Sequence, residues 1–239
     1  MTLEGVVFDF DGVIANSEPL HLRVYQTLLA QEKLPLSASE YYERYLGIDD
    51  VGVFEALARD KGLDIAGDRM AGLMARKTEI FLRLAHNGQV LFDGAADCMT
   101  TVAAVVPVAI ASGALRHEIE QILEAAGLRA VVPVIIAAGE TQRGKPAPDP
   151  YAAAVEQMSR GLGRQIDSSR VVAIEDSRTG LRSARAAGLR TLGLTTSYPA
   201  NTLIEAEHVL ADISQVTLEQ LDALAASDWA DADGPRCAR

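Results

Sequence analysis

The chain has 239 residues, of which 49% are hydrophobic, and a formal net charge of −11 at pH 7. This length and composition suit one elaborated globular domain or two modest ones. The negative charge argues against nucleic acids and anionic membranes as partners, because both bind clustered Lys and Arg. It is compatible with a metal cation held by carboxylates.

The remaining global features point to the cytoplasm. Cys98 and Cys237 are the only cysteines, so no disulfide framework is implied and a reducing compartment is favoured. The first strand begins within a few residues, which leaves no room for a signal peptide. The apolar stretch 101–111 is too short to span a bilayer and contains Pro107. We expect a cytoplasmic protein, and a monomer and a small homo-oligomer both stay open.

Residues 5–16 read G-V-V-F-D-F-D-G-V-I-A-N, an apolar run that ends in two acids and a glycine. The apolar part is typical of a central strand buried on both faces of a parallel sheet. Asp9 and Asp11 then lie at its carboxyl end, where ligands bind in open α/β sheets, and Gly12 permits a sharp turn. The alternative is that Asp-Gly here serves only as a turn.

After this strand, residues 17–88 show helical periodicity throughout. Apolar residues recur at helical spacing within 22–29, 41–46, 53–58 and 70–84. No strand pattern interrupts them. We predict an all-helical segment inserted between the first strand and the rest of the chain, placed to act as a lid.

From residue 93 onward, helices and strands alternate. The patterns predict short buried strands over 106–112, 131–138, 171–176, 190–195 and 208–213. The fold class that follows is α/β, with a Rossmann-like, doubly wound parallel sheet and an inserted helical cap domain. The predicted domains are a discontinuous core over 1–16 and 89–226 and a cap over 17–88. Residues 227–239 lack periodicity and are predicted to be a disordered tail.

Polar residues follow several of the later strands. Ser112 and Gly113 end one strand, and they offer a hydroxyl and main-chain N–H groups to a phosphate. Glu175 and Asp176 end another. Each has a structural alternative, since Ser112 is also suited to cap the helix over 115–126 and Asp176 to cap the helix that follows it.

The loop after the strand over 131–138 carries Lys145. Residues 139–145, G-E-T-Q-R-G-K, match most of a nucleotide-binding P-loop, but Pro146 stands where that loop needs Ser or Thr. Two further prolines, Pro148 and Pro150, are expected to delay the next helix until about Tyr151. Lys145 is therefore interpreted as a cation fixed in a stiff loop, the alternative being an ordinary solvated lysine.

Taken together, these strand ends favour one site. Hard oxygen ligands without clustered His or Cys are typical of Mg²⁺, which prefers carboxylates together with waters and substrate phosphate. A carboxylate can attack phosphorus to give an aspartyl phosphate, and a second acid two residues later can move protons. A nearby lysine and the cation would offset charge on the phosphoryl oxygens.

At this point the sequence resembles the haloacid dehalogenase superfamily, in the subgroup with a helical cap after the first strand. The resemblance rests on D-F-D-G-V-I, I-A-S-G, G-K-P-A-P-D-P-Y and I-E-D-S. It implies a Mg²⁺-dependent phosphatase acting on a small phosphorylated metabolite. It argues against dehalogenation, because the members that cleave carbon–halogen bonds lack the second aspartate. The roles it implies are nucleophile for Asp9, general acid/base for Asp11, and phosphoryl binding for Ser112, Gly113 and Lys145. It also implies metal binding by Asp9, Asp176 and the main-chain carbonyl of Asp11, with Glu175 as an assisting ligand or beside the ligands.

The resemblance is greatest to β-phosphoglucomutase, phosphoglycolate phosphatase and sugar-phosphate phosphatases. It implies that His21 and Lys77, on the cap, bind substrate, although His21 also suits an ordinary helix surface. A phosphomutase is the alternative function. It is weakened because the mutases have an arginine just after the cap's glycine loop, where this chain reads Gly47-Ile48-Asp49-Asp50. A non-catalytic binding protein with the same fold is a third possibility.

Overall fold

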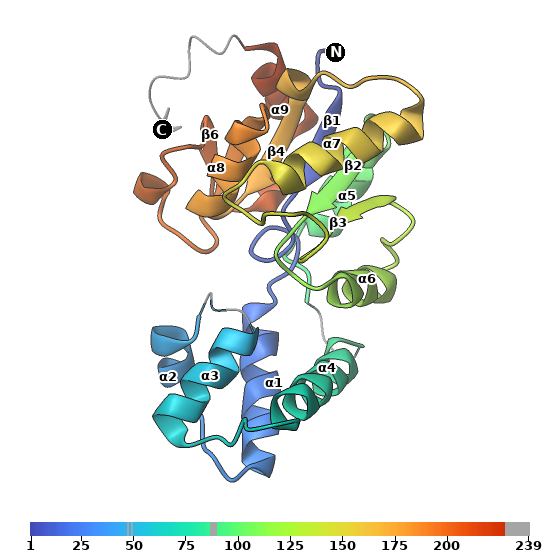
Figure 1. Cartoon of the computed structure of the whole chain (residues 1–239). Coiled ribbons are helices and arrows are strands. Elements are labelled where there is room, and N and C mark those ends of the chain that lie inside the picture. Colours follow the sequence, from blue (N-terminus) through green and yellow to red (C-terminus); the bar gives the residue numbers. More distant parts are fainter. Residues whose placement is uncertain (47, 49, 87–89, 228–239) are drawn as a thin grey trace. The chain divides into compact units, whose positions relative to one another are not determined.

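The computed structural model describes residues 1–46, 48, 50–86 and 90–227. The chain forms two compact units, one of Met1–Asn16 with Leu91–Arg239 and one of Ser17–Val90. Figure 1 shows that the first contains the sheet and the second is built of helices. Gly47 and Asp49 of the cap's glycine loop, and the predicted tail from residue 228 onward, lie outside the described residues.

The sheet confirms the predicted fold class. Its strands are β1 (Gly5–Phe8), β2 (Val108–Ala111), β3 (Val134–Ile136), β4 (Val171–Glu175), β5 (Arg190–Leu194) and β6 (His208–Leu210). In the described part of the chain they form one six-stranded sheet in the order β3-β2-β1-β4-β5-β6, with every neighbouring pair parallel. This is a doubly wound order, and its switch point lies between β1 and β4.

All of the strands after β1 are shorter than the sequence pattern predicts, β4 and β5 by one residue and β2, β3 and β6 by three or more. The apolar runs over 106–112 and 131–138 give only β2 and β3, which begin after Pro107 and Pro133. Proline has no N–H to donate to a ladder, so it stands at or before the start of a strand. Pro107 still accepts a hydrogen bond through its carbonyl, from the Val6 N–H at 3.1 Å.

Helices of the same unit cover the sheet. They are α5 (Ala95–Ala103), α6 (Arg116–Ala125), α7 (Asp149–Leu162), α8 (Arg178–Ala186) and α9 (Leu218–Ala226). Tyr151 of α7 packs in a buried cluster with Val7, Ala109 and Ala173 of the central strands. Phe8 is the neighbour of Val7 in β1 and therefore points to the other face of the sheet, and it is equally buried. Both faces of the sheet are thus covered.

The start of α7 differs from the prediction. The two prolines were expected to delay the helix until about Tyr151, but it begins at Asp149 with Pro150 in its first turn. The first N–H groups of a helix have no partner within the helix, so proline costs nothing there. As a result, Tyr151 lies in the first turn of α7.

The second unit consists of α1 (Glu18–Gln31), α2 (Ala38–Arg44), α3 (Asp50–Lys61) and α4 (Arg69–His86). The described residues between these helices form no strand, as the periodicity predicts. Aromatic side chains fill its interior: the Tyr25 ring lies 5.7 Å from that of Phe54 and 5.9 Å from that of Tyr41. The unit therefore has a hydrophobic core of its own.

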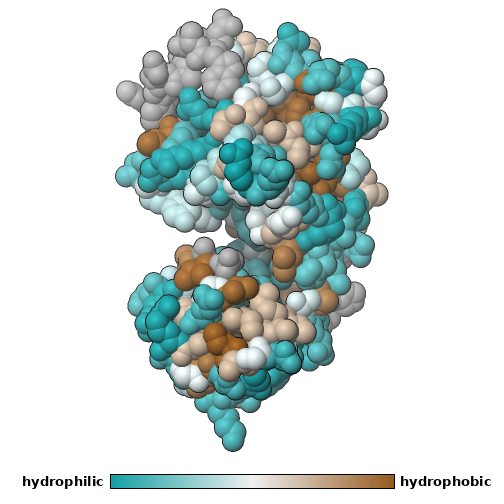
Figure 2. Space-filling model, viewed as in Figure 1, coloured by the Kyte–Doolittle hydropathy of each residue, from teal (hydrophilic) through white to brown (hydrophobic). Residues whose placement is uncertain are grey.

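Figure 2 shows a surface that is largely hydrophilic on the visible face, with apolar residues gathered in places on both units. In the helical unit, the exposed apolar side chains include Leu46, Ile48 and Val51, near the end of α2 and the start of α3. Among the helices described, none is both long and apolar enough to cross a membrane.

Candidate active site

The carboxyl ends of β1, β2 and β4 meet at one edge of the sheet. Phe8 of β1 is level with Ile110 of β2 and Ile174 of β4. The next residues along these strands therefore bring Asp9 and Glu175 to the same edge, beside the switch point where a doubly wound sheet binds its ligands. Asp9 is 7% exposed and Glu175 is fully buried. Predicted site residues that are far apart in the sequence thus lie together.

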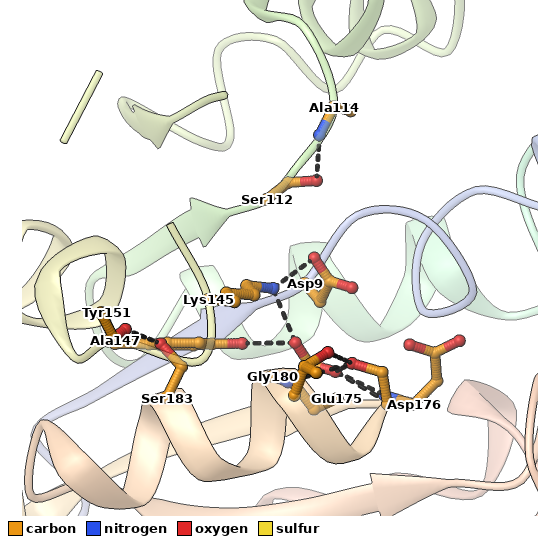
Figure 3. A network of polar contacts seen from close by, with 12 residues as sticks. Asp9, Ser112, Ala114, Lys145, Ala147, Tyr151, Glu175, Asp176, Gly180 and Ser183 are labelled. Carbon is orange, nitrogen blue, oxygen red and sulfur yellow. Dashed lines mark hydrogen bonds and ion pairs between the residues drawn. The ribbon is translucent and has the colours of Figure 1, made fainter. Parts of the chain in front are cut away.

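Lys145 joins these two acids. Its ammonium group lies 2.8 Å from Asp9 Oδ1 and 2.6 Å from Glu175 Oε1 (Figure 3). The alternative of a solvated loop lysine is not what the structure shows, since the side chain is 13% exposed. Two of the three ammonium N–H groups are taken by carboxylates, and a phosphoryl oxygen is a suitable acceptor for the third.

Glu175 is held by donors on both oxygens. Oε1 accepts from Lys145 and from the Tyr151 hydroxyl at 3.0 Å. Oε2 accepts from the N–H of Asp176 at 3.0 Å and from the N–H and hydroxyl of Ser177, both at 2.9 Å. Five donors fill about the capacity of a carboxylate. Its orientation, and with it the position of Lys145, is therefore strongly determined.

Gly180 allows this arrangement because Glu175 lies directly against the first turn of α8. A Cβ atom at position 180 would stand 1.5 Å from Glu175 Oε1. Ser177, rather than Asp176, caps this helix, since its hydroxyl accepts the Gly180 N–H at 3.1 Å. The capping alternative for Asp176 is therefore wrong, and its carboxylate does not serve as the N-cap of α8.

Asp176 lies against the turn that follows β1. Gly12 has a φ of 79°, and a Cβ atom there would stand 1.8 Å from Asp176 Oδ2 and 2.9 Å from the Ser197 hydroxyl. Only glycine satisfies both the left-handed backbone and this close approach. The hydroxyl of Thr196 donates to the Gly12 carbonyl, so the loop after β5 holds the turn in place.

Asp11 belongs to the same turn. It is half-buried and forms a β-bridge with Ala15, which is itself bridged to Leu91. Its predicted roles, proton transfer and a main-chain contact to the metal, stay predictions.

Ser112 follows β2 and is 5% exposed. Its hydroxyl accepts the Ala114 N–H at 3.0 Å, forming a local turn (Figure 3). The N-cap residue of α6 is Leu115, with no side-chain cap, so the capping alternative for Ser112 is wrong as well. Its predicted role with Gly113 in phosphoryl binding stays a prediction.

The electrostatics of the site reflect crowded carboxylates. Burial raises the pKa of Asp9 well above its usual range, and the charges of Glu175 and Asp176 add to this while Lys145 opposes it. Burial, with the charge of Glu175, raises the pKa of Asp176 to about 7. Burial disfavours the charged form of Lys145, but Asp9 and Glu175 outweigh it and the pKa is raised. The three acids thus outnumber the ammonium group that lies between two of them.

This donor set fits a divalent cation. One oxygen each from Asp9, Glu175 and Asp176 lies within 4.8 Å of the others. Buried carboxylates in excess of their counter-charge are costly, and a cation bound between them removes that cost. Carboxylate oxygens are also the donors that hard cations prefer.

The two predicted cap residues lie in the helical unit. The Lys77 ammonium is 2.8 Å from Asp50 Oδ2, and the Tyr25 hydroxyl donates to Asp50 Oδ1 at 2.6 Å. The His21 ring is tilted against Phe81, with centroids 5.1 Å apart. Lys77 is thus buried in an ion pair rather than presented as an isolated cation. Substrate binding by His21 and Lys77 stays a prediction.

Sequence reasoning assigned no role to four residues that the structure places in contact with predicted site residues or with the turn at Gly12. Tyr151 closes the motif that contains Lys145, which is a signal that its side chain has a task. Thr196 and Ser197 follow β5, but two hydroxyls after an apolar run carry no recognisable pattern. Asp50 begins α3 and looks like a helix-terminal acid.

The fold and the site define a class: an α/β enzyme of doubly wound topology with a buried carboxylate–lysine centre at its switch point. Residues 3–188 match the model of the haloacid dehalogenase-like hydrolases, and the chain belongs to this family. This confirms the resemblance noted in the sequence.

Relatives narrow the class further. The chain is 31% identical over 206 residues to CbbY of Rhodobacter capsulatus, covering 83% of this chain and 88% of that protein. It is 27% identical to validoxylamine A 7′-phosphate phosphatase of Streptomyces hygroscopicus subsp. limoneus, covering 88% and 94%. The crystal structure of a CbbY mutant from Rhodobacter sphaeroides with xylulose-(1,5)bisphosphate matches with a TM-score of 0.74, 28% identity and coverage of 92% and 99%. The chain is therefore a phosphatase of this family.

Proposed function

We propose that the protein is a Mg²⁺-dependent phosphatase that hydrolyses a small phosphorylated metabolite through an aspartyl phosphate on Asp9. The observation that carries this proposal is the placement of Asp9, which is buried within the acid cluster and 2.8 Å from the Lys145 ammonium group. A carboxylate so placed is oriented by a cation on one side and is close to further acids that favour a bound metal.

In the first step, an Asp9 carboxylate oxygen attacks phosphorus and the bond from phosphorus to the ester oxygen breaks. The leaving alkoxide takes a proton from Asp11, two residues further along the turn, and departs as an alcohol. Lys145 stays hydrogen-bonded to Asp9 and reaches a phosphoryl oxygen with its remaining N–H, while Ser112 and Gly113 bind the other oxygens.

In the second step, water attacks the phosphorus of the aspartyl phosphate. Asp11, now ionised, takes a proton from this water, and the acyl phosphate bond breaks. Inorganic phosphate leaves and the Asp9 carboxylate is restored, with Asp11 protonated for the next cycle. Asp11 therefore serves as acid in the first step and as base in the second. The aspartyl phosphate divides one difficult displacement at phosphorus into two easier ones.

The residues that would hold Mg²⁺ are Asp9, Asp176 and the main-chain carbonyl of Asp11. Glu175 would lie next to these ligands rather than among them, because its oxygens already accept five hydrogen bonds. When bound, the cation would offset charge on the phosphoryl oxygens and favour the ionised form of Asp9. Gly12 lets the turn lie against Asp176, which brings these oxygens together.

The substrate class follows from the relatives and the charge. The similar proteins include a CbbY mutant bound to xylulose-(1,5)bisphosphate and a phosphatase named for validoxylamine A 7′-phosphate. A net charge of −11 does not suit a polyanionic macromolecule. We therefore place the substrate among sugar phosphates, sugar bisphosphates and compounds of the phosphoglycolate type.

The test is phosphate release from a panel of such compounds with Mg²⁺ and, in parallel, with the metal chelated. We expect turnover of at least one compound only with the metal, and a phosphate adduct on the peptide that contains Asp9 after rapid denaturation. A flat panel in the presence of Mg²⁺ would overturn the proposal. Sugar-phosphate isomers formed without phosphate release would instead identify a phosphomutase.

A further inference from the structure

Tyr151 is a fully buried tyrosine in the first turn of α7, and the proposed mechanism gives it no task. Its hydroxyl donates to Glu175 Oε1 at 3.0 Å. Its ring lies beside Lys145, with the ammonium nitrogen 5.1 Å from the ring centroid. Tyr151 thus contacts both members of the pair that faces Asp9 (Figure 3).

The hydroxyl contact matters because Glu175 Oε1 has two donors. Lys145 donates to it at 2.6 Å and Tyr151 at 3.0 Å. A neutral donor on the same oxygen reduces the electron density available to the ammonium group. Without it, Lys145 would be drawn more strongly toward Glu175 and away from Asp9, where the phosphoryl group is transferred.

The ring contact limits where the ammonium group can lie. A cation near an aromatic face is attracted to it, and the ring also shields one side of the ammonium group from water. Lys145 therefore has Glu175 and the Tyr151 ring on one side and Asp9 on the other. These contacts leave the ammonium group few positions.

We propose that Tyr151 is a positioning residue for phosphoryl transfer, which acts through Glu175 to hold the Lys145 ammonium group toward Asp9. This inference rests on the proposed function, in which Lys145 binds the phosphoryl group. Tyr151 should affect the transition state more than substrate binding, since charge on the phosphoryl oxygens is redistributed as the bond to the leaving group breaks.

The test is Tyr151→Phe, which keeps the ring and removes the hydroxyl. We expect kcat to fall about tenfold, the effect of one hydrogen bond of ordinary strength. The dissociation constant of orthovanadate, measured by calorimetry with Mg²⁺, should rise by a similar factor, because vanadate resembles the transferring group. That of inorganic phosphate should change less than about twofold.

A matched control is Tyr45→Phe in the helical unit. Tyr45 is also a buried tyrosine whose hydroxyl donates to a carboxylate, that of Asp60 at 3.1 Å. Loss of this hydroxyl should leave kcat and both dissociation constants unchanged. A purely structural effect of Tyr151→Phe would lower the fraction of folded protein without changing the vanadate affinity of the rest, and that result would overturn the proposal.

A second variant tests the route through Glu175. In a Glu175→Gln background, Tyr151→Phe should change the vanadate dissociation constant less than about twofold, whereas another tenfold loss would overturn the proposal. Vanadate binding requires no turnover, so it tests the role of Tyr151 independently of hydrolysis. A wild-type protein that binds vanadate but hydrolyses nothing would refute the proposed function, and the vanadate dissociation constants of the variants would still test the inference about Tyr151.

Discussion

The ammonium group of Lys145 lies 2.8 Å from Asp9, although 136 positions separate the two residues in the chain. The loop after β3 carries the lysine, and the end of β1 carries the acid. Glu175 of β4 accepts from the same ammonium group at 2.6 Å, so three parts of the core unit meet at one cation. The geometry of this pair depends on the parallel sheet, which brings the strand ends to one edge.

The first prediction concerns Asp9→Asn. An amide does not attack phosphorus, so kcat should fall by about 10³-fold or more. The metal-free variant should also be more stable, because a carboxylate is removed from a buried cluster that raises its pKa. A gain of about 1 kcal/mol corresponds to about 2–4 °C in Tm for a protein of this size. Phosphate release and thermal unfolding measure the two effects.

The control is Asp97→Asn, on an exposed acid in the first turn of α5. It should leave activity within about twofold of the wild type, as for most surface changes. A lower Tm for metal-free Asp9→Asn would show that the pair with Lys145 outweighs the repulsion among the acids.

The second prediction concerns Gly180→Ala. The new Cβ atom would stand 1.5 Å from Glu175 Oε1, so the carboxylate must move and take Lys145 with it. We expect a loss of about 1–3 kcal/mol in the free energy of unfolding, as for other overpacked sites. We also expect kcat to fall at least about tenfold. Denaturant unfolding and phosphate release measure both.

Gly161→Ala is its matched control, since Gly161 lies in α7 of the same unit and an alanine Cβ atom there would meet nothing within 4 Å beyond the local helix backbone. Here alanine should be neutral or stabilising by up to about 1 kcal/mol, through its higher helix propensity. Equal losses in the two variants would contradict the importance of the contact with Glu175.

The sequence predicted the strand ends well because each polar residue there interrupts a buried apolar run. Asp9 and Glu175 are cases of this kind, and the doubly wound fold follows from the same alternation. Contacts made by side chains across the fold carry no such signal. The bond from Thr196 to Gly12 spans 184 positions and depends on where the loop after β5 passes.

The cap residues illustrate the same limit. The sequence marks Lys77 as a cation on a helix, and by resemblance as a substrate contact. Whether an acid neutralises it depends on how α3 packs against α4, and the structure pairs it with Asp50 at 2.8 Å. Periodicity predicts both helices but not which of their side chains meet.

The third prediction concerns Thr196→Val, which keeps the shape of the side chain and removes its hydroxyl. The hydroxyl donates to the Gly12 carbonyl, and Gly12 lies against Asp176. A looser turn should separate the proposed metal ligands. The Mg²⁺ concentration for half-maximal activity should rise about three- to tenfold, the effect of about one hydrogen bond. A Mg²⁺ titration of phosphate release measures it.

Thr195→Val provides the comparison, because the neighbouring hydroxyl donates to the Ala211 carbonyl, at 3.3 Å, and not to the turn after β1. This variant should keep the Mg²⁺ dependence of the wild type. If both variants shift the titration equally, the loop acts through general stability and not through Gly12.

The last prediction concerns His21 and pH. Burial lowers the pKa of His21 to about 4, the charge of Lys77 adds to this, and Asp50 opposes it. Its Nδ1 atom is buried without a hydrogen-bond partner in the described part of the chain. In the unfolded chain the pKa is about 6.5. Between these two values the unfolded state binds a proton that the folded state does not, so stability falls as the pH drops from about 6.5 toward about 4.

From pH 7 to pH 5 this contributes a loss of about 2 kcal/mol in the free energy of unfolding. His21→Gln removes the titrating group, so the variant should lose about 2 kcal/mol less than the wild type over the same range. Urea unfolding at both pH values measures the difference. Glu18, whose pKa is raised by burial, titrates in both proteins and cancels in the comparison. Equal losses in the two proteins would mean that His21 is protonated in the folded unit, with Asp50 as its counter-charge.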